Sequence, residues 1–117
     1  MRAAVAEPMI ESELWVSFVS MLRSYAAAAN VNLGKVWVVS NGMTVTISAF
    51  ATQIEMRFDE KTGQGTWEKR VAGRPAFPGA FAIEPEGMIR INGAVKDFDH
   101  AAIDLIASVT ERGKETW

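Results

Sequence analysis

Short segments in which apolar and polar residues alternate follow one another between residues 35 and 92, most of them separated by glycine, proline or asparagine. Alternation with a period of two gives a β-strand one apolar face, and closely spaced turn residues join such strands as antiparallel hairpins. Segments with a helical period of apolar residues lie on both sides of this region. The sequence therefore predicts a helix, an antiparallel meander of five or six strands, and a second helix.

The first predicted hairpin turns at residues 41–42, an Asn-Gly pair. Such a pair accepts the positive φ angles of a two-residue type I′ turn, which predicts that Ser40 lies opposite Met43. In this register one face of the hairpin is apolar and belongs to the core. The other face is mostly polar, yet it carries Trp37 and Val39.

Two more hairpins are predicted further along the chain. Residues 53–59 and 66–71 alternate as strands, and opposite charges across them favour one register. The third hairpin covers residues 80–92, where Pro85 and Gly87 suit a three-residue turn. The predicted cross-strand pairs are Phe58 with Trp67, Arg57 with Glu68, Glu55 with Arg70, Ile83 with Ile89, and Phe81 with Ile91.

The first predicted helix runs from Pro8 to about Ala29, with Pro8 in its first turn. The second is predicted to have Asp99 as its N-cap, Ile103 in a hydrophobic staple and Gly113 at its end. The residues predicted to face the core from the second helix are Ala102, Leu105, Ile106 and Val109. The face of the first helix that lies opposite its apolar residues carries small residues, namely Ser17, Ser20, Ser24, Ala27 and Ala28.

Two amphipathic helices and one apolar sheet face predict an α+β two-layer sandwich, formed by residues 1–117 as one domain. A chain of 117 residues is long enough to bury a core of its own. The helices cover one face of the predicted sheet. The other face is left to water or to a partner.

Composition excludes several classes of function. The formal charge is −2, and the basic residues are scattered, so we expect no nucleic-acid partner. No run of apolar residues is long enough to cross a bilayer, so no membrane association is expected. The chain has no cysteine, which excludes disulfides and thiolate metal sites and suits a reducing compartment. The sequence therefore predicts a cytoplasmic protein.

The only histidine, His100, stands among Asp97, Asp99 and Asp104, and this group has the residue types of a metal site or an acid/base pair. The helical period, however, places His100, Asp104 and Ser108 opposite the apolar stripe, where solvated acids are expected near a helix N-terminus. No serine lies in a nucleophile-elbow motif. We therefore predict no catalytic residue, no metal and no cofactor.

Candidate interface residues are a stronger signal. Trp37 and Val39 share the polar face of the first hairpin, and tryptophan is enriched in interface cores. The segment at residues 70–81, with its two prolines and two glycines, carries Arg74 and Phe77. It is either a connector with Phe77 against the core or a recognition loop that presents both side chains.

These observations favour a non-enzymatic protein-interaction module whose partner is a second copy of the chain or another protein. The alternative is a carrier of small apolar ligands, with a pocket between helices and sheet. Its predicted lining is Met43, Met56, Phe58 and Phe81. An enzyme that uses His100 is a third hypothesis, for which His100→Ala would abolish activity or metal uptake.

Overall fold

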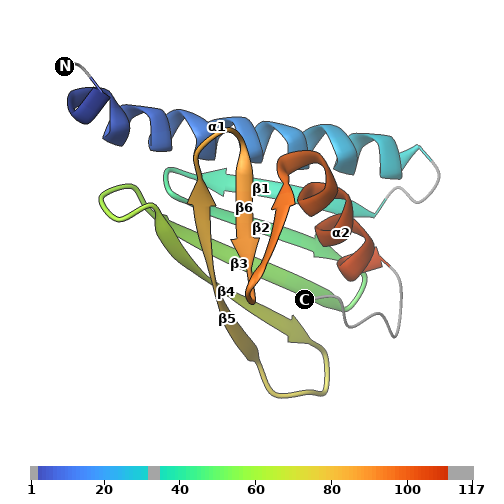
Figure 1. The fold of residues 1–117 in the computed structure, drawn as a ribbon. Coiled ribbons are helices and arrows are strands. Elements are labelled where there is room, and N and C mark those ends of the chain that lie inside the picture. The colour runs from blue at the N-terminus through green and yellow to red at the C-terminus, as the bar shows by residue number, and fades with distance from the viewer. Residues whose placement is uncertain (1–2, 32–34, 111–117) are drawn as a thin grey trace.

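The structure is a computed structural model that describes the backbone of residues 3–31 and 35–110, and the side chains of these ranges from residue 12 onward. A long helix leads into seven strands, and a shorter helix follows them (Figure 1). The elements are α1 (Ala3–Asn30), β1 (Val36–Asn41), β2 (Thr44–Ala49), β3 (Thr52–Asp59), β4 (Gln64–Val71), β5 (Phe77–Glu84), β6 (Met88–Ile91), β7 (Ala94–Asp97) and α2 (Phe98–Thr110).

The strands form one antiparallel sheet in chain order, from β1 to β7, and both helices pack on the same side of it (Figure 1). The predicted α+β architecture is therefore confirmed. The sheet has one strand more than the upper expectation because β6 and β7 form a separate hairpin. Asn92 and Gly93 form its turn with φ angles of 53° and 85°, the two positive values that a type I′ turn requires.

The predicted register of the β1–β2 hairpin is wrong by two residues, because the turn lies one residue further along the chain than predicted. Asn41 pairs with Thr44, so Gly42 and Met43 form the turn instead of Asn41 and Gly42. Gly42 has a φ of 64°, and Asn41 stays in the strand; a single glycine at the first turn position is typical of type II′. The shift is an even number of residues across the pair, so each side chain keeps its predicted face.

The predicted register of the β3–β4 hairpin is also wrong by two residues. Trp67 pairs with Met56, and Glu68 lies opposite Glu55, so the expected cross-strand ion pairs do not form. The loop is shorter than expected because Gly63 turns the chain at a φ of 74° and Gln64 already belongs to β4. The ion pairs run along the strands instead, from Arg57 to Glu55 and from Arg70 to Glu68.

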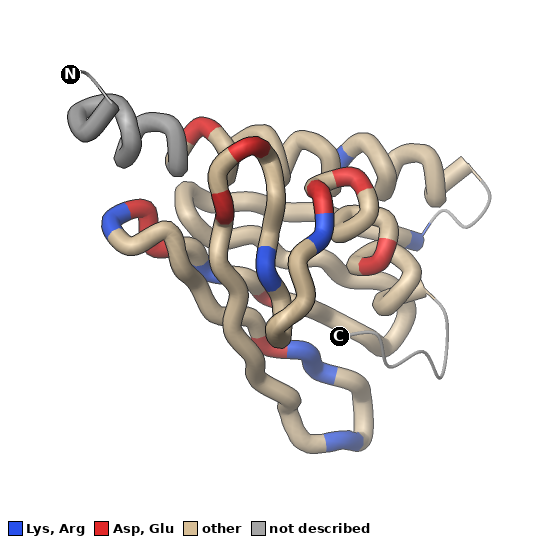
Figure 2. Tube along the Cα trace, viewed as in Figure 1, with Lys and Arg blue, Asp and Glu red and all other residues tan. Residues whose placement is uncertain are grey.

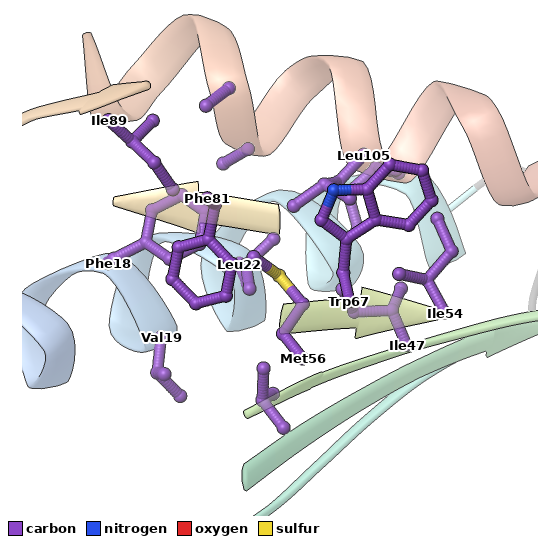
Figure 3. Close-up of a cluster of buried hydrophobic side chains, with 14 of the residues drawn as sticks. Phe18, Val19, Leu22, Ile47, Ile54, Met56, Trp67, Phe81, Ile89 and Leu105 are labelled. Carbon is purple, nitrogen blue, oxygen red and sulfur yellow. The ribbon is translucent and has the colours of Figure 1, made fainter. Parts of the chain in front are cut away.

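The predicted pairs Ile83–Ile89 and Phe81–Ile91 of the β5–β6 hairpin are confirmed. Its three-residue loop ends with Gly87 at a φ of 77°, as the sequence indicates. The inward residues of the sheet and helices then meet in one core. Figure 3 shows Met56 and Trp67 of the sheet pointing toward Leu22 of α1 and Leu105 of α2.

Three aromatic rings stack at the centre of the space between α1 and the sheet. The Trp15 ring lies 5.1 Å from that of Phe58 and 6.0 Å from that of Phe81, nearly parallel to both. The Phe58 and Phe81 rings are 6.3 Å apart. Offset stacks of this kind stabilise a core beyond the burial of their area.

The small residues of α1 lie on its exposed face, as predicted, and Trp15, Phe18 and Leu22 face the core on the other side. The helix begins at Ala3, however, so Pro8 is not in its first turn. In α2 the predicted core stripe is buried. Its N-cap is Asp97 rather than Asp99, because the carboxylate of Asp97 accepts a hydrogen bond from the backbone N–H of His100 at 2.8 Å.

Two further expectations for α2 differ from the structure. Ile103 is 44% exposed, so it does not complete a hydrophobic staple. Ser108 is buried rather than solvent-facing, since its hydroxyl accepts a hydrogen bond from Lys69 Nζ at 2.9 Å. The predicted helix end at Gly113 lies outside the described residues.

Candidate interaction surfaces

The outer face of the sheet is the face that points away from both helices. On its β1–β2 part, alternate residues project outward while their neighbours enter the core. Trp37 and Val39 stand there with exposed fractions of 63% and 64%. We call the outward residues of these two strands the Trp37 patch: Trp37, Val39, Asn41, Thr44, Thr46 and Ser48.

The Trp37 patch is uncharged. Val39 lies opposite Thr46 and Trp37 lies opposite Ser48, so each apolar side chain has a short polar neighbour. Neither β1 nor β2 contains an acidic or basic residue. Figure 2 shows the charged residues on other elements. Low charge beside an exposed tryptophan is typical of the core of a protein interface.

Charged residues of the outer face begin on β3. Glu55 and Glu68 lie directly opposite each other on β3 and β4, which is unfavourable for two like charges. Each carboxylate has an arginine two residues away on its own strand, at 3.6 Å from Arg57 and 2.7 Å from Arg70. The hydrogen bond to Glu68, together with its negative charge, raises the pKa of Arg70. This group is neutral overall.

Two stretches of the sheet edge are protected, one along β1 and one along the first half of β5. Figure 1 shows α1 running alongside β1. The Asn30 side chain accepts a hydrogen bond from the Val36 N–H at 2.7 Å and donates one to the Val36 carbonyl at 2.8 Å. The first half of β5 pairs only with β4, and Pro78 there has no N–H to offer a further strand. Pairing with another sheet through β1 or through the first half of β5 is therefore disfavoured.

The segment at residues 70–81 is mostly strand, with a turn from Val71 to Arg74 that Gly73 closes at a φ of 82°. Arg74 is exposed. Phe77 opens β5 and is 55% exposed, while its ring meets the Trp67 ring edge-on at 5.7 Å. Phe77 is therefore partly exposed to solvent and partly packed against the buried Trp67.

The four interface candidates do not form one surface. Trp37 and Val39 are neighbours on the outer face of β1. Arg74 and Phe77 belong to the β4–β5 hairpin, three strands away, and Phe77 projects on the helix side because it alternates in phase with the buried Phe81. Sequence separation alone could not show this division.

His100 is exposed, and its Nδ1 lies 2.8 Å from the carboxylate of Asp97. The backbone and ring hydrogen bonds from His100 lower the pKa of Asp97. Tyr25 of α1 donates a hydrogen bond to Asp99 at 2.9 Å, which raises the pKa of Tyr25. Within residues 12–31 and 35–110, no three histidine or acidic side chains converge as metal ligands would. The group fixes the start of α2 against α1.

Lys69 is a residue that sequence reasoning missed. It is 5% exposed and donates to Ser108 in the last turns of α2, where a helix C-terminus favours a positive charge. The sequence did indicate that Lys69 points inward, because strand alternation places it on the same face as the inward Trp67. Its contact with α2 gives the buried cation a structural role.

The pocket predicted for an apolar ligand has its lining residues packed together. Met56, Phe58 and Phe81 are at most 5% exposed, and the two phenylalanine rings stack with Trp15. Met43 packs against the same core from the β1–β2 turn. These side chains fill the space in which the ligand would lie.

Comparison of the chain with protein-family models, curated proteins and solved structures finds no significant match. Among the described helices, none is both long and apolar enough to cross a membrane.

Proposed function

We propose that this protein is a non-enzymatic interaction module that self-associates through the Trp37 patch. The observation that carries the proposal is the pair of exposed apolar side chains, Trp37 and Val39, side by side on a sheet face that no described element covers. Tryptophans in such positions are frequent binding hot spots. A solvated sheet face requires neither of them.

The chemistry of the patch suits a second copy of the chain. In a two-fold symmetric dimer the same surface meets itself, so a strongly charged patch would face its own charge. The Trp37 patch carries no charge and surrounds two apolar groups with hydroxyls and one amide. Contact with its own copy therefore buries apolar area without opposing like charges.

The protected edges support a contact made through side chains. Strand addition at β1 by a second folded copy would bring the helix α1 of that copy against this α1, because α1 lies along the same edge (Figure 1). At β5, Pro78 removes one of the hydrogen bonds that such a pairing needs. The outer face has no comparable obstacle.

Light scattering over a dilution series tests the proposal. We expect the mass of the purified chain to fall from two copies toward one as it is diluted. Val39→Thr should move this transition to higher concentration by about ten-fold, because a buried methyl is replaced by a hydroxyl. Val95→Thr is the matched control, since Val95 is also an exposed valine on an outermost strand. A chain that is monomeric at all concentrations would refute self-association.

The carrier hypothesis stays a prediction with no contact in its favour, because the side chains expected to line its pocket pack on one another. The predicted cytoplasmic location also stays a prediction.

A further inference from the structure

A short groove lies where one side of α1 meets the end of β1 and the β1–β2 turn. Its volume is about 240 Å³. An apolar cavity of roughly 150 Å³ holds benzene, so the groove has room for a small molecule. Ser40 lines it and alternates along β1 with the outward Val39, so the groove opens on the helix side of the sheet. It is therefore separate from the Trp37 patch.

Two contacts between α1 and the end of β1 bound the groove. At one end the Trp15 indole N–H donates to the Gly42 carbonyl at 3.4 Å. At the other end the Arg23 guanidinium donates to the Ser40 hydroxyl. At 1.5 Å per residue, Arg23 lies about 12 Å further along the helix axis than Trp15. Since these side chains reach the β1 edge, the space between them suits a compact ligand rather than an added strand.

The part of the groove between these two contacts is apolar. Val16 and Val19 of α1 line it. Val19 is 8% exposed and Val16 is 59% exposed, so a ligand placed there would remove apolar surface of Val16 from water. The space beside Gly42 is also open, because a Cβ on this residue would meet no atom within 4 Å. The middle of the groove therefore favours an apolar group.

Arg23 gives one end of the groove a positive charge. It forms no ion pair with a carboxylate in the described part of the chain, whereas Arg57, Arg70 and Arg90 each do. A neutral hydroxyl satisfies only part of a guanidinium, whose fork of donors matches a carboxylate. The Ser20 hydroxyl, one helical turn before Arg23, also lines the groove and can donate. This end of the groove therefore favours an anion.

We propose that this groove binds a small monocarboxylate with an apolar body. The carboxylate bonds to Arg23 and Ser20, and the apolar body lies on Val16 and Val19 toward Trp15. Arg23 alone balances a single negative charge, and the lining has no second basic residue for a phosphate dianion. This binding activity is independent of self-association through the Trp37 patch.

The probes are isocaproate, phenylacetate and hydrocinnamate, each compared with its own carboxamide on the unaltered protein. We expect at least one carboxylate to bind with a Kd that is roughly millimolar, as is typical of a ligand of about ten heavy atoms. Binding should shift the indole N–H resonance of Trp15 and the amide resonance of Gly42. The matching carboxamide should bind at least ten-fold more weakly, because it lacks the charge that Arg23 recognises.

Two arginine variants test where the charge is recognised. Arg23→Gln should weaken binding by a factor similar to that of the carboxamide. Arg57→Gln, at an exposed arginine on the outer face of the sheet, is the matched control and should leave the affinity unchanged. The carboxamide comparison needs no substitution, so it tests the proposal even where Arg23→Gln alters the fold. Val39→Thr should bind the carboxylate as the parent does.

Four outcomes would overturn the proposal. No carboxylate of the panel binds, or a carboxamide binds as well as its carboxylate, which would leave an apolar surface without anion recognition. Inorganic phosphate displaces the ligand at equal concentration, which would leave an unspecific anion site at Arg23. The resonance shifts fall on Trp37 and Val39, which would place the ligand on the Trp37 patch.

Discussion

The indole of Trp67 lies over the backbone of Gly79, its cross-strand partner on β5, so closely that a Cβ on Gly79 would overlap the ring. The next pair on the same face of these two strands repeats the relationship in reverse, because the Phe81 ring covers Gly65. Neither glycine has a positive φ. Both are present because an aromatic ring takes the space of their side chains.

Gly79→Ala should therefore destabilise the fold by about 2 kcal/mol or more, the range seen when a packed core receives an extra methyl group. Denaturant unfolding measures the loss. Ala80→Ser, one residue further on the exposed outer face, is the control and should stay within about 0.5 kcal/mol of the parent. Equal stability of the two variants would mean that the indole does not occupy this space.

Phe50 should lower the stability of the fold because of its backbone conformation. It has a φ of 54° in the β2–β3 turn and is 61% exposed. A bulky side chain in the left-handed region costs about 1 to 2 kcal/mol, whereas asparagine tolerates that region well. Phe50→Asn should raise the free energy of unfolding by about 1 kcal/mol, and Phe50→Leu should not. A loss of stability in Phe50→Asn would reveal a contact that retains the ring.

Pro78 should protect the free half of β5 from pairing with other chains. Pro78→Thr restores an N–H that points to the open side of the sheet, next to the exposed groups of Ala80. We expect this variant to form larger species at concentrations where the parent does not, as measured by light scattering. Pro75→Thr, in the connection that precedes β5, is the control. A Pro78→Thr chain that behaves like the parent would contradict the edge argument.

Asp97 should make stability depend on pH at the acid end. Its hydrogen bonds from His100 lower its pKa in the folded state. The stabilisation is present above the ordinary aspartate pKa of about 3.9 and is lost as pH falls through the folded value. The difference in melting temperature between the parent and Asp97→Asn, which retains an acceptor for the cap, should shrink below about pH 4. A difference that stays constant from pH 6 to pH 2 would exclude this origin.

The architecture was predictable because period and turn residues act locally. Alternation identified which residues of each strand face the core, and this survived two register errors, since both shifts were even. The registers themselves depended on which turn position each glycine takes. Gly42 alone has the positive φ at its turn, and Gly65 belongs inside a strand because of a ring from β5 that the local sequence does not reveal.

The candidate surfaces were predictable only in part. Exposure of Trp37 follows from alternation within one strand. The cover on the β1 edge depends on how α1 lies along this strand, and on the Asn30 side chain that bonds to Val36. Contacts between elements distant in sequence set both features. The inward position of Lys69 was, by contrast, already implied by the phase of Trp67.

The solution mass and melting temperature of Trp37→Glu, measured on the same sample, test self-association through the Trp37 patch most directly. Because Trp37 is 63% exposed, a charge there should leave the isolated fold intact while opposing a charge on the second copy. We predict a monomer whose melting temperature equals that of the diluted parent. A Trp37→Glu chain that keeps the mass of the parent at every concentration would contradict the account.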